Sequence, residues 1–365
     1  MKSILKKTHL SREVSCENFN IESRNYKKHT NTALIKIKFG SICGSDIHAY
    51  FESDIYASFP TPRVLGHEAS GIIIDIISDE NADETGFTKG DLVSINPIIE
   101  CEKCEMCRAG KTNLCVNRKM FGSDFDGLLQ EEVVVPLKNL VKFERINDAR
   151  VVALLEPFAV ALHAVKHALA AGLKKDTPVL LLGAGKISLF ISIILKKLIN
   201  IEEIKIVGID KDLDVRLPFF QNYGSTLIFN KLFQNDGKIK SLRFIGRKYS
   251  VIFEVTGTEK GMRASLNSLD SGGTVIAVGL DDSDILVNIS DIVRKEKRIV
   301  GSDAYTIRDL EEARGLIDSG LINNEWIKVY SPDDCKLAFQ DYENSKVMIS
   351  LFQFYEGADH HTPHS

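Results

Sequence analysis

Between Thr177 and Val300 the chain alternates short apolar runs with stretches of helical periodicity, and this alternation restricts the possible folds more than any other feature. Apolar runs of this length, separated by helical patterns, are typical of parallel strands joined by helical crossovers. The predicted strands are 179–182, 205–209, 226–229, 251–255 and 274–278. The sequence therefore predicts an α/β protein in which this part forms a doubly wound parallel sheet.

The part of the chain before this region is rich in predicted β-strands. Residues 34–39 alternate large apolar side chains with lysine, which is the two-residue period of a half-buried strand. Further strands are predicted at 71–77 and 92–95, and a helix between Pro157 and Gly172. Because 365 residues exceed what one hydrophobic core usually fills, we expect two domains.

The two ends of the chain provide little apolar sequence. No uninterrupted apolar segment of the secretory-signal type follows the first seven residues, which predicts a cytoplasmic protein. The periodicity weakens after Val300, and the tail 357–365 is polar and rich in histidine. The tail histidines either bind metal or, as we favour, belong to a frayed end.

Charge and hydropathy restrict the classes of partner. The formal net charge is -4, and lysine and arginine are spread along the chain, so no basic stripe is available for nucleic acid. The most apolar stretch, 179–195, is interrupted by Lys186 and two glycines, which indicates a buried strand, a turn and a helix. We therefore expect neither a nucleic-acid partner nor a membrane span, and a small molecule as the substrate.

Four of the seven cysteines lie close together. Cys101, Cys104, Cys107 and Cys115 are separated by two, two and seven residues, which allows one loop to surround a tetrahedral zinc ion with four thiolates. A closed site of this kind has no open position for a substrate, so this zinc is predicted to be structural. Two disulfides, or four unrelated thiols, are the alternative, which a reducing compartment disfavours.

A second group of potential zinc ligands is dispersed along the chain. Cys43, His67 and Glu156 together would supply the three protein ligands of a catalytic zinc and leave one position open. One thiolate and one carboxylate would neutralise the ion. Taken singly, each residue has a simpler explanation. A lone Cys or His is more often packed in a core. The carboxylate of Glu156 is also favourably placed at a helix N-terminus, whose dipole attracts negative charge.

A glycine turn predicts a dinucleotide site. Gly183 and Gly185 follow the strand 179–182 and open a helix, so pyrophosphate can approach the free amides at the helix N-terminus. We expect Gly183, Gly185, Lys186, Ile187, Thr256 and Val278 to bind the cofactor. Ser188 stands where the fingerprint has its third glycine; it is expected to loosen helix packing without blocking the phosphates, whereas Lys186 could attract them.

Asp210 favours NAD over NADP. It lies 25 residues beyond Gly185 at the end of the next predicted strand, close to the spacing at which an acid binds the adenosine ribose hydroxyls. A carboxylate there repels the additional phosphate of NADP, although the adjacent Lys211 leaves NADP open. A capping role for Asp210 in a loop is the alternative.

The order of these motifs resembles that of the zinc-containing medium-chain dehydrogenases along the whole chain. The run Cys43 to His48, the Gly66-His67-Glu68 element, the four-cysteine lobe and the glycine turn carry the resemblance, and Glu156 places the chain near the polyol and sugar-acid branch, which includes sorbitol, L-idonate and L-galactonate dehydrogenases. It implies a GroES-like catalytic domain at 1–160 and 301–365, with the structural zinc lobe at 97–118. A Rossmann domain at 161–300 is implied as well.

The same resemblance assigns roles around the catalytic zinc. Cys43 and His67 are ligands, while Glu156 is the third ligand or holds the zinc-bound water, and Glu68 competes or exchanges with it. Asp46 would accept a hydrogen bond from His67. The catalytic residues would be Ser45, His48 and Glu68, with the substrate proton leaving through Ser45 and His48; a turn serine and a surface histidine are the alternative.

The substrate is less constrained by the sequence. Where sorbitol dehydrogenases have an arginine after the Gly301 region, this chain has Asp303, Ala304 and Tyr305, which argues against sorbitol. Tyr50, Phe121 and Tyr305 either line the pocket or pack in the core. The substrate could be a polyol, a sugar acid or a secondary alcohol.

We expect the protein to bind two zinc ions per chain and NAD, and to form a homodimer or homotetramer. The competing hypothesis is a non-catalytic, zinc-stabilised dinucleotide sensor or decayed enzyme, with a zinc-free quinone reductase less favoured.

Overall fold

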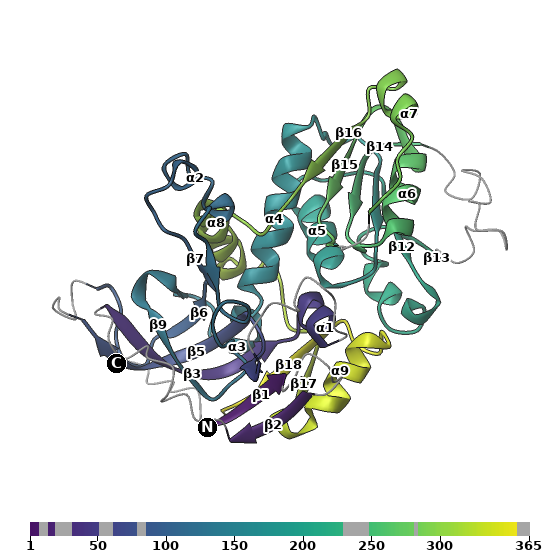
Figure 1. The fold of residues 1–365 in the computed structure, drawn as a ribbon. Helices are drawn as coiled ribbons and strands as arrows, with labels where there is room; N and C mark the ends of the chain where they lie inside the picture. The colour runs from purple at the N-terminus through teal and green to yellow at the C-terminus, as the bar shows by residue number, and fades with distance from the viewer. Residues whose placement is uncertain are drawn as a thin grey trace. The chain divides into compact units, whose positions relative to one another are not determined.

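The computed structural model describes residues 1–6, 14–18, 31–50, 61–78, 85–228, 248–280 and 284–355, without the side chains of residues 48–50, 227 and 228. The chain groups into two compact units (Figure 1). The first unit consists of Met1–Glu156, Leu310–Glu343 and Ile349–Ser365. The second unit consists of Pro157–Asp309 and Asn344–Met348.

A seven-stranded sheet forms the centre of the first unit. Its order is β10-β6-β5-β3-β18-β17, and β9 pairs with β3 as well. The strands are β3 (Thr32–Ser41), β5 (Glu68–Ile77), β6 (Leu92–Ile95), β9 (Glu132–Pro136), β10 (Leu140–Lys142), β17 (Ile327–Tyr330) and β18 (Ile349–Gln353). Ile35 and Ile37 of β3 and Ile73 of β5 are buried in its core. The predicted strands 34–39, 71–77 and 92–95 correspond to β3, β5 and β6, and β3 and β5 are longer than predicted.

Smaller elements complete the first unit. Strands β1 (Lys2–Lys6), β2 (Val14–Asn18) and β4 (Arg63–Val64) form a three-stranded sheet, and β7 (Ile98–Ile99) pairs with β8 (Lys119–Met120). The helices are α1 (Gly44–Tyr50), α2 (Glu105–Arg108), α3 (Ala149–Val152) and α9 (Cys335–Glu343), and the 3-10 helices are η4 (Thr112–Leu114), η5 (Leu137–Asn139) and η9 (Pro332–Asp334). The hairpin β7–β8 holds together the two ends of the four-cysteine segment.

The C-terminal part of the chain is more regular than its sequence pattern indicated. Helix α8 (Ile307–Asp318) buries Leu310, Ala313 and Ile317, which recur at helical spacing. Strand β18 then pairs antiparallel with β3, and β17 pairs parallel with β18. The pattern after Val300 is weak because the polar side chains of α8 outnumber the apolar ones, although its buried face is complete.

A six-stranded parallel sheet forms the second unit. Its order is β13-β12-β11-β14-β15-β16, and every neighbouring pair is parallel. The strands are β11 (Val179–Leu182), β12 (Ile204–Gly208), β13 (Ser225–Ile228), β14 (Tyr249–Glu254), β15 (Leu269–Ala277) and β16 (Arg298–Gly301). The five predicted strands are present, but β15 begins five residues earlier than predicted, and β16 is an additional edge strand. This strand order confirms the predicted doubly wound architecture.

Helices connect and flank these strands. They are α4 (Leu155–Ala170), α5 (Lys186–Lys197), α6 (Glu259–Ser268) and α7 (Ile289–Arg294), with the 3-10 helices η6 (Asp210–Asp212) and η7 (Leu217–Phe220). Helix α6 packs against β14 and β15. Helix α4 begins two residues before Pro157, which its first turn tolerates because that N–H has no intrahelical partner. Within the described part of the chain, no helix combines the length and apolar character that a membrane crossing requires.

Candidate metal centres and dinucleotide site

The antiparallel pairing of β3 and β5 creates the first candidate metal centre. Ser41, the last residue of β3, is paired with Glu68, the first residue of β5. Cys43 follows two residues after Ser41, and His67 immediately precedes Glu68, so all three ligating side chains gather at one end of the strand pair. The ligand atoms of Cys43, His67 and Glu68 lie within 4.8 Å of one another. Strand register therefore assembles a thiol, an imidazole and a carboxylate from two separate segments.

The side chain of Asp46 holds the two segments of this centre in place. Its carboxylate accepts hydrogen bonds from the backbone N–H of Cys43 (2.9 Å) and of Gly66 (3.1 Å). The family resemblance implied instead that Asp46 accepts a hydrogen bond from His67. In the structure the carboxylate acts on the backbone of the residues at and beside the ligands, so it fixes the position of both segments. Burial raises the pKa of Asp46, which the nearby His67 and the two amides oppose.

Gly66 allows the chain to turn sharply before His67. Its φ is +88°, a left-handed conformation that side chains rarely adopt, and an added Cβ would lie 2.3 Å from the Cγ of Leu129. Any other residue here would have to displace Leu129, which is completely buried. The glycine thus fixes the direction in which the imidazole of His67 leaves the backbone.

Electrostatics around His67 favour a cation. Burial acts to lower the pKa of His67, but Cys43, Asp46 and Glu156 act in the opposite direction, and together they raise the pKa well above its usual value. Only 8% of His67 is exposed, and Glu68 is completely buried. Acidic groups around a buried imidazole are stable when a positive charge is present, and a divalent ion supplies that charge. The donor set of sulfur, nitrogen and carboxylate oxygen also matches the ligands that zinc takes in proteins.

The other residues predicted for this centre are not part of the ligand group. Glu156 is the second residue of α4 and is 5% exposed; it influences His67 through its charge but is not part of the ligand group, which contains Glu68. Ser45 lies in α1, two residues after Cys43, and is partly buried. His48 and Tyr50 lie in α1 as well, but their side chains are outside the described part of the structure.

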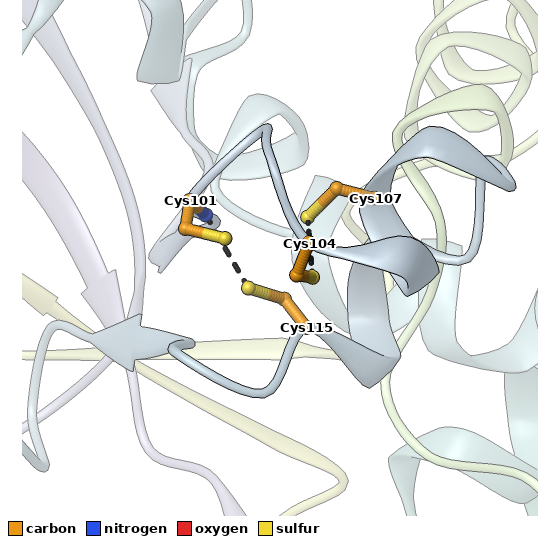
Figure 2. Close-up of side chains that lie close together, drawn as sticks. All are labelled: Cys101, Cys104, Cys107 and Cys115. Carbon is orange, nitrogen blue, oxygen red and sulfur yellow. Dashed lines mark hydrogen bonds between the residues drawn. The ribbon is translucent and has the colours of Figure 1, made fainter.

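The four cysteines of the 97–118 lobe face one another (Figure 2). Their sulfur atoms all lie within 4.8 Å of one another, and none of the four forms a disulfide. The backbone N–H of Cys101 donates to the sulfur of Cys115 at 3.3 Å, and the thiols of Cys104 and Cys107 are 3.5 Å apart. The structure thus brings the predicted set together in the arrangement of a closed four-thiolate site, not of two disulfides.

Backbone amides prepare two of these thiols for deprotonation. Amide N–H groups of Lys103 and Cys104 lower the pKa of Cys101 to about 6, despite an opposing effect of desolvation. Amides of Cys107 and Val116 lower the pKa of Cys104 as well. Cys107 differs, because desolvation and its thiol neighbours raise its pKa to about 12. Amide-to-sulfur hydrogen bonds stabilise thiolates, and thiolate is the form that binds zinc, so the lobe fits a metal ion.

The base of this lobe is anchored to the first unit by a buried amide. The side-chain N–H₂ group of Asn139 donates to the backbone carbonyls of Asn96 (2.9 Å) and Ile98 (2.8 Å), where the chain enters the lobe. Lys138 also contacts Glu100 and Glu102. The lobe is therefore attached at its base, while helix α2 inside it buries no residue. Without a metal ion, few apolar contacts would hold its four cysteines together.

In the second unit, the glycine turn after β11 has room for a ligand. Gly183 has a φ of +115°, and Gly185 is the N-cap of α5. A Cβ built on Gly185 would meet no heavy atom of the described residues within 4 Å, and Gly185, as the N-cap residue, has no side chain to cap the start of α5. The N-terminus of α5 and the open space beside Gly185 fit the pyrophosphate of a dinucleotide. The hydroxyl of Ser188 is buried without a hydrogen-bond partner among the described residues. This fits a position where the dinucleotide fingerprint has a glycine, which needs no partner for a side chain.

The other predicted cofactor residues lie at the same edge of the sheet. Asp210 follows β12, Thr256 follows β14, and Val278 follows β15; because all strands are parallel, their carboxyl ends meet at one edge. Asp210 is exposed, whereas Asp212 is buried and accepts the backbone N–H of Ile209 at 2.8 Å. Lys186 and Ile187 form the first turn of α5; the side chain of Lys186 is buried.

One buried acid at this edge was not predicted from the sequence. Glu254 ends β14 and is 1% exposed; its carboxylate accepts the backbone N–H of Thr256 (2.9 Å) and Gly257 (3.3 Å) and the hydroxyl of Thr256. The residue fixes the turn that carries Thr256, directly beside the glycine turn, because Glu254 and Leu182 are in register. The feature of the sequence that could have indicated Glu254 is an acid placed directly after the apolar run 251–253.

Two of the residues considered for the substrate pocket lie in the interior. Phe121 is 1% exposed and belongs to the core of the first unit, with its ring 6.0 Å from that of Phe125. Tyr305 is 2% exposed. Of the two uses considered for Phe121, core packing is the one that its surroundings support.

Comparisons with known proteins agree with this architecture. Residues 29–145 match the family model of the alcohol dehydrogenase GroES-like domain, and residues 191–319 match that of zinc-binding dehydrogenases. The chain is similar to a probable D-xylulose reductase A of Aspergillus fumigatus, with 32% identity over 89% of this chain and 90% of that protein. It is also similar to the L-galactonate-5-dehydrogenase of Escherichia coli, with 30% identity over 87% of this chain and 88% of the relative.

A solved structure supports the fold independently. A short chain alcohol dehydrogenase from Escherichia coli, complexed with NADH, superposes with a TM-score of 0.81, at 23% identity and covering 97% of this chain and 99% of that one. The relatives named above are dehydrogenases or reductases, which favours an enzyme over a non-catalytic sensor. The chain therefore belongs to the zinc-containing medium-chain alcohol and polyol dehydrogenases, oxidoreductases that combine a GroES-like domain with a Rossmann-type domain.

Proposed function

We propose that the protein transfers a hydride between the carbinol carbon of a polyol or sugar acid and NAD. The observation that carries this proposal is the cluster of Cys43, His67 and Glu68, which offers zinc a sulfur, a nitrogen and an oxygen ligand within 4.8 Å. The names of two relatives, a D-xylulose reductase and an L-galactonate dehydrogenase, favour a sugar-derived substrate. In this proposal the first unit is the catalytic domain, and the second unit binds the dinucleotide.

The two candidate metal centres have different roles in this proposal, one structural and one catalytic. The four cysteines hold a structural zinc, since a closed thiolate set leaves no position for substrate. Cys43 and His67 hold the catalytic zinc together with one carboxylate, for which Glu68 is nearest and Glu156 is the exchanging partner. A zinc ion bound there acts as a Lewis acid that lowers the pKa of a hydroxyl group.

The protein's own residues then handle the proton and the geometry. Asp46 keeps Cys43 and the Gly66–His67 turn in fixed positions through its two backbone hydrogen bonds. Ser45, on the turn of α1 next to Cys43, is proposed to accept the substrate proton. His48, one helical turn farther, would pass it to solvent, since an imidazole changes its charge near neutral pH. Glu254 positions the turn of Thr256 at the dinucleotide site.

Activity with defined substrates tests this function. We expect the purified protein to contain two zinc ions per chain, to oxidise NADH in the presence of D-xylulose, or to reduce NAD with L-galactonate. A panel of polyols, sugar acids and simple secondary alcohols, assayed through NADH absorbance, ranks the substrate classes. Two zinc ions and NADH binding without turnover on any member of the panel would contradict the proposal.

Replacing Asp210 is expected to change the choice of cofactor. In Asp210→Ser the carboxylate that would bind the ribose hydroxyls of NAD is absent, and so is its repulsion of the NADP phosphate. We expect KM for NAD to rise about tenfold, because a charge-assisted hydrogen bond contributes roughly 1.5 to 3 kcal/mol, while KM for NADP falls. Asp214→Ser is the matched control, because Asp214 is an exposed acid four residues away. Equal effects of the two substitutions would exclude Asp210 from cofactor selection.

We further propose that the edge of the parallel sheet forms a dimer contact. Among the strands that the structure describes, β16 pairs only with β15 and lies at the edge of the sheet. The segment around it exposes large apolar side chains: Leu280 (58%), Leu286 (83%), Val287 (44%), Ile289 (65%), Val293 (68%) and Ile299 (47%). An apolar surface beside an open strand edge fits a second copy of the chain, which would present the same edge in a symmetric pair.

The dimer contact predicts a change in oligomeric state. Val293→Asp places a charge in the contact, so sedimentation velocity should show a monomer where the native protein sediments as a dimer or tetramer. Leu169→Asp is the control, since Leu169 is also exposed (44%) but lies on α4. A native protein that is monomeric at micromolar concentration, or a variant that keeps the native state, would refute this contact.

A further inference from the structure

Helix α4 carries a pair of histidines outside the two zinc centres and the dinucleotide site. His163 and His167 are four residues apart, which places them on the same face of the helix. Their Nε2 atoms are 3.1 Å apart, and the two rings are nearly perpendicular, at 81°. His163 has 12% of its side chain exposed, and His167 is half-buried, so solvent reaches the pair.

A buried carboxylate fixes the tautomer of His163. The Nδ1 atom of His163 lies 2.7 Å from a carboxylate oxygen of Asp309, in α8. Although burial acts to raise the pKa of Asp309, hydrogen bonds from His163, Lys166 and Thr306 hold it well below its usual value. The charged carboxylate therefore keeps the proton of His163 on Nδ1, and Nε2 presents its lone pair toward His167. A histidine that binds a metal through one ring nitrogen usually donates the N–H of its other ring nitrogen to a carboxylate or a carbonyl group.

His167 supplies a second imidazole. Burial and the neighbouring His163 lower the pKa of His167, so the ring is uncharged at neutral pH. In the absence of an ion, one proton lies between the two Nε2 atoms. When His167 carries its proton on Nδ1 instead, both Nε2 atoms offer lone pairs to the same point, and no proton has to leave the protein.

We propose that His163 and His167 form a binding site for a borderline divalent transition-metal ion such as Zn²⁺, Ni²⁺ or Cu²⁺, with Asp309 as a positioning residue. Two nitrogen ligands at about 2.0 to 2.1 Å from a tetrahedral zinc ion are roughly 3.3 Å apart, close to the observed separation. Water completes the coordination. The ammonium group of Lys166 contacts the other oxygen of Asp309 at 2.7 Å and repels a cation, which makes this site weaker than the two zinc centres. An ion bound here would strengthen the attachment of α4 to the start of α8.

Titration of the zinc-loaded protein with Ni²⁺ tests this site. Isothermal titration calorimetry should show one additional ion per chain in the native protein, while elemental analysis verifies that its zinc is retained. In His167→Ala the affinity for this ion should fall by more than about tenfold, and in Asp309→Asn by about 10- to 100-fold. Lys166→Met is the matched control, because Lys166 contacts the same carboxylate without being a ligand; it should bind Ni²⁺ as tightly as the native protein or more tightly.

Two further measurements separate this site from other sources of binding. Replacing the tail histidines 360, 361 and 364 by alanine should leave the additional ion bound. The electron paramagnetic resonance spectrum of bound Cu²⁺ should show coupling to two imidazole nitrogens, which a merely structural pair would not give. Binding unchanged in His167→Ala, or lost in the tail variant, would overturn the proposal. If His167→Ala does not fold, His167→Gln serves in its place.

Discussion

Replacing Cys43 with serine should lower kcat/KM by about 10³-fold or more and remove one of the two proposed zinc ions. Loss of the thiolate leaves the catalytic ion with weaker and fewer ligands, and the interaction of a Lewis acid with a developing alkoxide contributes several kcal/mol to the rate. The thermal transition should change little, because Asp46 binds the backbone of Cys43 and Gly66, not the thiol. Steady-state kinetics and elemental analysis of the same preparation measure both effects.

Cys16→Ser provides the matched control for this experiment. Cys16 lies in β2, outside both cysteine-containing ligand groups, so this variant should keep both zinc ions and nearly full activity. If Cys43→Ser retained native kcat/KM, or if Cys16→Ser lost as much activity, the assignment of Cys43 to the catalytic centre would be wrong.

Replacing Cys104 with serine should destabilise the protein more than it slows the reaction. Helix α2 buries no residue, so the lobe depends on its ligands and on the anchor at Asn139. A loss of about 3 to 5 kcal/mol corresponds to a fall in Tm of roughly 10 °C, since 1 kcal/mol shifts Tm by about 2 to 4 °C in domains of this size. Differential scanning calorimetry and zinc content measure the change.

The turnover number distinguishes Cys104→Ser from Cys43→Ser. At a temperature where Cys104→Ser is folded, kcat should stay within about threefold of the native value, because Cys43 follows β3 and His67 and Glu68 lie at the start of β5, outside the lobe. One zinc ion should remain per chain. A variant with unchanged Tm and two zinc ions would show that the four thiols bind no structural ion.

The difference between these two centres also marks what the sequence can predict. Cys101, Cys104, Cys107 and Cys115 lie within 15 residues, so their spacing alone brings their sulfur atoms into one loop. The glycine turn is local in the same sense, because Gly183, Gly185 and the first turn of α5 are consecutive. The periodicity of the strands likewise predicts a parallel sheet, because it is read from neighbouring residues.

The proposed catalytic cluster requires long-range pairing. Cys43 and His67 are 24 positions apart in the chain, and the register of β3 with β5 places Glu68 beside them. The same holds for the role of Asp46, whose backbone partners become neighbours only after the turn at Gly66 forms. Glu254 could not be assigned from its apolar neighbours, since its function arises from its position beside the glycine turn.

The sequence by itself determined the alternation of strands and helices, the four-thiol lobe and the glycine turn after β11, because in each case the interacting groups are close along the chain. The tertiary structure alone decided which carboxylate adjoins Cys43 and His67, how β18 completes the first sheet, and how Asp309 reaches the histidine pair of α4. Those contacts join segments separated by up to about 300 residues, and only the packing of the folded chain fixes which side chains meet.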